Sequence, residues 1–152
     1  MKSKALKNND RGFTLPELLM ATVLMAVIFV GVLLTILKCL ELTDIARVSS
    51  AAVIAAKNKM MEVENTPYGS IVANYHNVPF DVSGFNGKGV TYATSASQAI
   101  TITAVVCWKQ PNGRVFGEDT NLNGAVNAGE DSNGNGRLDS IVQVTTIKNA
   151  LP

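Results

Sequence analysis

Oxygen-bearing side chains recur at a fixed spacing in one stretch of this 152-residue chain. The pattern Asp-x-Asn-x-Asn-Gly occupies residues 119–124 and returns twelve residues later, at 131–136. Calcium takes about six to eight oxygen ligands, and alternate side chains of a tight loop can surround it, with glycine permitting the turn at the sixth position. The spacing therefore indicates calcium-binding loops within residues 118–139. The stretch has no His or Cys, which disfavours zinc and copper.

The first copy ends in an acid that completes the calcium-loop pattern, whereas the second copy has Val142 at the corresponding position. The expected ligands of the first site are side chains and one backbone carbonyl: Asp119, Asn121, Asn123, the Ala125 carbonyl, Glu130 and, directly or through water, Asn127. The second copy offers the same kinds of oxygen: Asp131, Asn133, Asn135, the Arg137 carbonyl and Asp139. We therefore expect one or two structural calcium ions. The alternative is a metal-free loop, because Asn and Gly are ordinary turn residues.

A second feature lies near the N-terminus, where residues 18–37 contain no charged side chain. As a helix this run would span ~30 Å, the thickness of the hydrocarbon core of a bilayer. A chain this short has too little other protein to bury such a helix, so we expect a retained membrane anchor. Basic residues dominate the preceding flank, which predicts a cytoplasmic N-terminus and an outward-facing remainder. The flanking charges are Lys2, Lys4, Lys7, Arg11 and the single acid Asp10.

Glu17 stands at the edge of the apolar run. A carboxylate that enters hydrocarbon costs several kcal/mol without a partner, so we expect a cationic one. The alternative is a carboxylate solvated at the level of the headgroups. Glu17 also closes the hexapeptide Gly12-Phe13-Thr14-Leu15-Pro16-Glu17. With the basic leader and the apolar run, this hexapeptide resembles the prepilin processing motif of type IV pilins and type II secretion pseudopilins.

The resemblance implies that prepilin peptidase removes residues 1–12 by cleaving between Gly12 and Phe13, and that Phe13 is then N-methylated. It implies that Glu17 pairs with the charged N-terminus of a neighbouring subunit. The implied partners are other pilin or pseudopilin subunits, the peptidase, membrane lipid and an inner-membrane assembly platform, with no nucleic acid. The implied location is the bacterial inner membrane, with a periplasmic head, and then an extracytoplasmic filament.

Two departures from the wider family favour a minor subunit or pseudopilin over a major adhesive pilin. Leu34 stands where many major pilins carry a proline, and the chain lacks a pair of C-terminal cysteines. Residues 55–64 are also similar to the second helical half of minor pilins and I-type pseudopilins.

The helix is expected to run over residues 13–65, with a transmembrane and assembly half at 13–40 and an amphipathic half at 41–65. Apolar or small residues recur there every three or four positions: Leu42, Ile45, Ala46, Ser49, Ala52, Val53, Ala56, Met60 and Val63. Pro67 favours an end to the helix just before it.

A small globular head is expected over residues 66–152. Residues 65–88 are predicted to be a connecting loop, and alternating patterns predict strands at 89–94, 99–108, 114–117 and 141–147. Asn112-Gly113 predicts a hairpin turn, and Trp108 is expected in the core. The fold class is therefore α+β, a pilin-like long helix packed on an antiparallel sheet, with a calcium-binding loop.

Composition excludes several functions. A net charge of +1 and 6% aromatic residues do not suggest nucleic-acid binding. His76 is the only histidine, and no nucleophile–base pair stands out, so we expect no enzyme. Cys39 and Cys107 are not expected to pair. The expected function is a non-enzymatic, minor structural subunit of a type IV pilus or type II secretion pseudopilus. The alternative is a single-pass, calcium-dependent binding or adhesion protein outside any filament, which would keep residues 1–12.

Overall fold

The structure is a computed structural model that describes residues 12–150, and the chain divides into two compact units between Leu42 and Thr43. The first unit consists, in its described part, of a short N-terminal segment and the beginning of helix α1 (Leu15–Glu64). The predicted long helix is therefore confirmed. The most apolar part of α1 is not buried, and the helix is long and apolar enough to cross a membrane.

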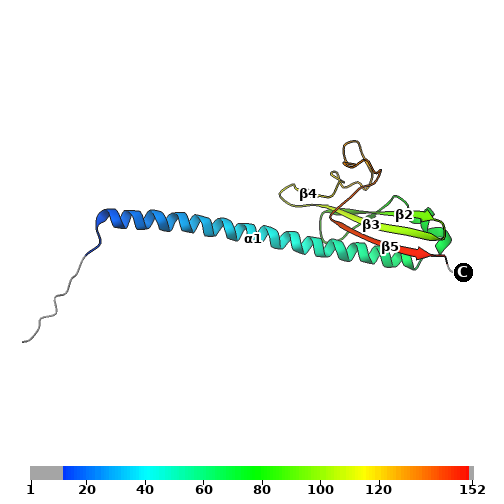
Figure 1. The fold of residues 1–152 in the computed structure, drawn as a ribbon, viewed down its shortest axis with the longest axis horizontal. Coiled ribbons are helices and arrows are strands. Elements are labelled where there is room, and N and C mark those ends of the chain that lie inside the picture. Colours follow the sequence, from blue (N-terminus) through cyan, green and yellow to red (C-terminus); the bar gives the residue numbers. More distant parts are fainter. Residues whose placement is uncertain (1–11, 151–152) are drawn as a thin grey trace, which may run out of the picture. The chain divides into compact units, whose positions relative to one another are not determined.

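The second unit contains the end of α1 and every strand found among the described residues (Figure 1). The elements after α1 are η1 (Tyr68–Ser70), α2 (Ile71–Tyr75), β1 (Val78–Asp81), β2 (Gly87–Ala96), β3 (Ala99–Lys109), β4 (Val115–Phe116) and β5 (Val142–Asn149). They form one antiparallel sheet in which β1 pairs β2, β2 pairs β3, and β3 pairs both β4 and β5. The α+β, pilin-like fold class and the predicted hairpin between β3 and β4 are confirmed.

The prediction of a loop over residues 65–88 is wrong in part, because this segment contains η1, α2 and β1. Asn, Gly and Pro are frequent in it, and each of these residue types favours turns locally. Tertiary contacts override that preference: Ile71 of α2 is fully buried, and β1 pairs with β2. Pro79 is compatible with β1 because β1 lies at the edge of the sheet.

One face of the sheet packs on the second half of α1. The side chains that form this core are Val48, Ala52, Ala56, Met60, Val63, Ile71, Ala93, Ile100, Ile102, Ala104, Val106, Trp108 and Val142. Trp108 is fully buried, as predicted, and stacks on Phe116 with ring centroids 5.1 Å apart. Two members of the predicted helical stripe, Leu42 and Ala46, are instead exposed.

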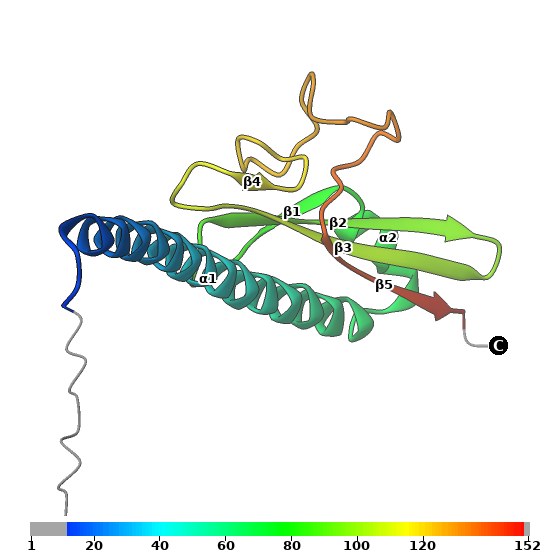
Figure 2. The same ribbon diagram turned by 60° about the vertical axis from the view of Figure 1, so that its left-hand side comes forward.

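The opposite face of the sheet carries a smaller core that the sequence did not predict. It consists of Val90, Tyr92, Val105, Cys107 and Leu138. Leu138 belongs to the long loop between β4 and β5, which Figure 2 shows on the other side of the sheet from α1. The sheet therefore buries residues on both faces, and the loop is part of the folded head.

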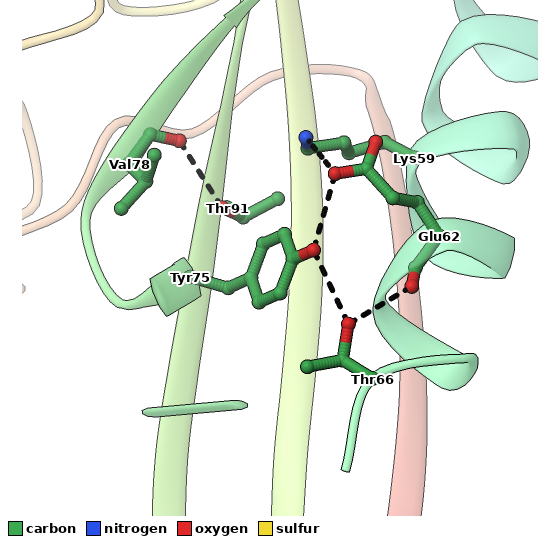
Figure 3. A network of polar contacts seen from close by, with 6 residues as sticks. All are labelled: Lys59, Glu62, Thr66, Tyr75, Val78 and Thr91. Carbon is green, nitrogen blue, oxygen red and sulfur yellow. Dashed lines mark hydrogen bonds and ion pairs between the residues drawn. The ribbon is translucent and has the colours of Figure 1, made fainter. Parts of the chain in front are cut away.

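The C-terminal end of α1 is tied to α2 by a polar network (Figure 3). Lys59 and Tyr75 both donate hydrogen bonds to Glu62 Oε1, at 2.8 and 3.1 Å. Thr66 Oγ1 donates to the Glu62 carbonyl and lies 3.3 Å from the Tyr75 hydroxyl. The hydrogen bond from Lys59 lowers the pKa of Glu62.

A separate contact joins the two neighbouring strands β1 and β2, because the Thr91 hydroxyl donates to the Val78 carbonyl.

Candidate functional site

The N-terminal motif surrounds the start of α1. The Thr14 carbonyl accepts the first helical hydrogen bond, from Leu18 N at 3.1 Å. Glu17 turns back toward the helix start, and its Oε2 accepts from Thr14 N at 3.5 Å. This long contact corresponds to one of the two hydrogen bonds of a capping box, the one in which an acid three residues into the helix accepts from the N–H of the capping residue. Within a single chain Glu17 therefore has a structural role, whatever it pairs with elsewhere.

The predicted cleavage site lies just before this cap. Gly12 and Phe13 precede α1, and Phe13 is 83% exposed. The rest of the predicted leader, residues 1–11, lies outside the described residues. Nothing within 4 Å would meet a Cβ added at Gly12. The chain's own fold therefore leaves room for a side chain at position 12.

The first loop copy is organised by its own side chains. Asp119 is fully buried, and its two carboxylate oxygens accept hydrogen bonds from Asn123 N at 3.1 Å and Gly124 N at 2.8 Å. Asn121 Oδ1 also accepts from Asn123 N, at 3.0 Å. Asn123 Oδ1 accepts from Ala125 N at 2.7 Å. The polar side chains thus wrap the backbone into a tight turn, with Gly124 at a φ of +75°.

The second copy repeats the same pattern twelve residues on. Asp131 accepts from Asn135 N and Gly136 N, at 3.0 and 2.7 Å. Asn133 Oδ1 accepts from Asn135 N, and Asn135 Oδ1 accepts from Arg137 N. Gly136 has a φ of +74°, nearly that of Gly124. The repeat read in the sequence is therefore also a repeat of backbone conformation.

The two copies differ in the polarity of the atoms that converge at their centres. In the first copy, three oxygens surround one amide nitrogen: Asn127 Nδ2 lies 3.3 Å from Asn123 Oδ1, 3.0 Å from the Ala125 carbonyl and 2.9 Å from Glu130 Oε2. In the second copy, two amide nitrogens meet one oxygen. Asn133 Nδ2 and Asn135 Nδ2 lie 2.7 and 2.8 Å from Asp139 Oδ2. The first centre presents oxygens, as a cation requires, whereas the second would need both amides to turn.

Glu130 closes the first copy and is 4% exposed. Its Oε1 accepts from the backbone N–H and the hydroxyl of Thr120, at 3.0 and 2.7 Å, and its Oε2 accepts from Asn127. Because the Thr120 hydroxyl and then Asn127 donate to the charged form, the pKa of Glu130 falls to about 2. Glu130 is therefore a carboxylate at neutral pH and is held in place by donors from both ends of the loop.

Two contacts attach the loop to the sheet and a third braces the loop from within, and none of the three is predicted by the sequence. Glu118 accepts from Ser132 N and Asp139 N, at 3.0 and 2.9 Å, and so clamps both ends of the second copy. Leu138 N donates to the Tyr92 hydroxyl on β2 at 2.8 Å. Gly124 lies against β1. These partners are distant in sequence from the loop repeat, or fall outside its Asp-x-Asn-x-Asn-Gly pattern, so no local signal reveals them.

Among residues 12–150 no group of three or more His, Cys, Asp or Glu side chains is arranged to hold a metal ion. The candidate loop ligands are instead mostly amide and carbonyl oxygens. His76 is exposed, and its Nδ1 lies 2.8 Å from the Ala93 carbonyl. Cys39 is exposed, Cys107 is buried, and neither forms a disulfide.

The comparison with protein families identifies the N-terminal segment. Residues 7–33 match the prokaryotic N-terminal methylation motif. No curated protein and no solved structure matches the chain. The chain thus carries a prepilin-type N-terminus, of the class found on type IV pilin-like proteins, ahead of an α+β pilin-like head.

Proposed function

We propose that this protein is a minor structural subunit of a type IV pilus or a type II secretion pseudopilus. The observation that carries the proposal is the methylation motif over residues 7–33, which contains Gly12, Phe13 and Glu17 and leads into the exposed apolar part of α1. Prepilin peptidase cleaves after Gly12, and the chain waits in the inner membrane with its head in the periplasm. Its work is packing against other subunits, with no catalysis.

In the filament, Glu17 pairs with the methylated amine of Phe13 on an adjacent subunit. The exposed apolar side chains of residues 15–40 support this, because a helix with no partner on any side needs lipid or other helices around it. Between apolar helices a carboxylate without a counter-charge is costly, and breaking a buried pair costs about 3–5 kcal/mol. That cost sets the register at which neighbouring helices pack.

The head is braced by calcium in the first loop copy. The donor set fits a hard cation: Asn123 Oδ1, the Ala125 carbonyl and Glu130 Oε2 already converge on one atom, Asn127 Nδ2. With Asp119 and Asn121 they would supply oxygen ligands after that amide moves aside. The second copy is the weaker candidate, because two amide side chains would have to turn away from its centre, against one in the first copy.

The assembly role is tested by comparing Glu17→Ala with Glu17→Gln in cells that make the filament. Glutamine retains a capping-box acceptor for Thr14 N but removes the charge. If Glu17 acts as the partner of an amine, both variants insert into the membrane yet are depleted at least tenfold from sheared filaments. Normal incorporation of Glu17→Gln would contradict the ion pair and leave only the helix cap.

The second candidate function is a membrane-anchored, calcium-dependent binding protein outside any filament. The folded loop between β4 and β5 favours it, because that loop covers one face of the sheet and exposes most of its polar residues. Such a protein would retain residues 1–12 and would be missing from sheared filaments whatever residue stood at position 17.

A further inference from the structure

The outer side of β5 is an open sheet edge. Ala150 N donates to the Gln98 carbonyl at 2.8 Å, in register with the pairing of β3 and β5. Alternate residues of an antiparallel strand point their backbone groups to the same neighbour, so the even-numbered residues of β5 face β3. The odd-numbered residues present N–H and C=O groups to the outer edge: Gln143, Thr145, Ile147 and Asn149. No other strand among residues 12–150 pairs with them.

The opposite edge of the sheet, at β1, is interrupted by a proline. Lys109 N donates to the Asn86 carbonyl, in register with the β2–β3 pairing, so the alternation places Pro79 with its nitrogen outward. Proline has no N–H to offer there. The loop also touches this edge at one point, because a Cβ added at Gly124 would lie 2.5 Å from the Pro79 Cβ. The β1 edge therefore offers fewer free backbone donors to a partner strand than the β5 edge does.

β5 lacks the features that usually protect an edge. It contains no proline, and Lys148 is its single charged residue. The Lys148 ammonium is engaged, since it donates to the Glu64 and Thr66 carbonyls at 2.7 Å each. The rest of the strand, Val-Gln-Val-Thr-Thr-Ile, is uncharged and rich in residues that favour strands.

A groove lies between β5 and the end of α1. It is lined by Lys57, Met60, Met61, Glu64, Val144, Thr145 and Thr146. Met61 is 54% exposed, which leaves an apolar surface beside the edge. Lys57 is exposed and takes part in none of the ion pairs of the described chain. The groove therefore suits an extended segment with an apolar side chain over Met61 and an acidic one near Lys57.

We propose that an extended strand of a different filament subunit, rather than a second copy of this chain, adds to the outer edge of β5. Its backbone pairs with Gln143, Thr145 and Ile147, and its side chains on the α1 side contact Met61 and form an ion pair with Lys57. The proposal rests on the proposed function, because the strand donor is a filament neighbour. Main-chain hydrogen bonds give such an interaction its strength, and the groove selects the side chains.

Hydrogen exchange read residue by residue tests this directly. In the detergent-solubilised, processed chain, the amides of Gln143, Thr145 and Ile147 exchange rapidly, whereas those of Val144 and Thr146, bonded to β3, are protected. In isolated filaments the three outward amides become protected by at least a hundredfold. Unchanged rapid exchange in filaments that contain the chain would overturn the proposal.

A matched pair of variants gives an independent reading. Thr145→Pro removes one outward N–H without touching the hydrogen bonds to β3, and Thr145→Val keeps the N–H. Both lose the contact between the Thr145 and Thr103 hydroxyls, which lie 3.1 Å apart. We expect Thr145→Pro to lower incorporation into filaments at least tenfold, and Thr145→Val to incorporate normally. Equal incorporation of the two folded variants would contradict strand addition.

The outcomes separate this proposal from the proposed function. A wild-type chain that never enters filaments refutes the filament role itself. A chain that enters filaments with unprotected β5 amides refutes only strand addition. Protection that develops in the purified chain alone, as its concentration rises, assigns the edge to a second copy and overturns the choice of a different subunit. If Thr145→Pro does not fold, hydrogen exchange at the outward β5 amides of the wild-type chain still tests strand addition.

Discussion

The backbone N–H of Leu138 donates a 2.8 Å hydrogen bond to the hydroxyl of Tyr92, and Leu138 is fully buried. Tyr92 lies in β2, whereas Leu138 lies in the second loop copy, so this bond joins the polar loop to the sheet. Burial raises the pKa of Tyr92 further above neutral pH, where a tyrosine hydroxyl is already protonated. An apolar contact and a buried hydrogen bond therefore hold the loop to the sheet. The hydrogen bonds within the loop shape the loop itself.

Tyr92→Phe removes the acceptor for Leu138 N and leaves a buried N–H without a partner. The free energy of unfolding of the head should fall by about 1–3 kcal/mol. Tyr75→Phe is the matched control, because the Tyr75 hydroxyl donates to the exposed Glu62 carboxylate, and its loss should cost about 1 kcal/mol or less. Denaturant unfolding of the detergent-solubilised chain measures both. Equal effects would show that the loop is not anchored through Tyr92.

Gly124 and Gly136 occupy equivalent positions with nearly equal positive φ, but only Gly124 touches another element. Gly136→Ala should cost about 1–2 kcal/mol for the left-handed backbone alone. Gly124→Ala carries the same strain and also meets Pro79, which adds about 1–3 kcal/mol. Thermal unfolding of the two variants under identical conditions checks the order. A larger effect at Gly136 would refute the packing of the first loop copy on β1.

Calcium should stabilise the head. At a free concentration of about 100 times the dissociation constant, binding to the folded state alone adds about 2.7 kcal/mol, which raises the melting temperature of a domain this size by roughly 10–20 °C. Glu130→Gln should abolish most of this shift while retaining an acceptor for Thr120. Differential scanning calorimetry in calcium and in a chelator measures the difference. Identical melting curves of the wild-type chain in the two buffers would remove the calcium proposal.

Asp139→Asn in the second copy is the control for that experiment. It removes a candidate carboxylate from the centre where Asn133 and Asn135 converge. If calcium occupies the first copy alone, the calcium-dependent shift of Asp139→Asn should equal that of the wild-type chain, and titration calorimetry should give one ion per chain. Two ions per chain, with one lost in Asp139→Asn, would show that both loop copies bind calcium.

The sequence predicted the elements whose pattern is local. The helix over 13–65, the strand at 99–108 and the hairpin at Asn112-Gly113 were recognised from hydrophobic periodicity and turn chemistry, and they differ from the structure by a few residues at most. The alternation of Ile100, Ile102, Ala104 and Val106 identified the face of β3 that packs on α1. Local patterns suffice there because each residue's role depends on neighbours along the chain.

Features that depend on distant contacts could not be predicted. β1 contains a proline and is only four residues long, so its existence depends on pairing with β2. The second core could not be predicted because Leu138 is an isolated apolar residue in a loop of Asn, Gly and Asp. The candidate ligand residues of the loop repeat were predicted from their spacing, but the clamp by Glu118 and the opposite polarity of the two centres appear only in three dimensions.

The central claim is that this chain is processed as a prepilin, and intact-mass analysis of the protein isolated from membranes tests it most directly. We expect the wild-type chain to lack residues 1–12 and begin at N-methylated Phe13, and a Gly12→Val variant to keep the full leader. A wild-type chain that retains residues 1–12 in the membrane, or begins at any residue other than Phe13, would refute prepilin processing.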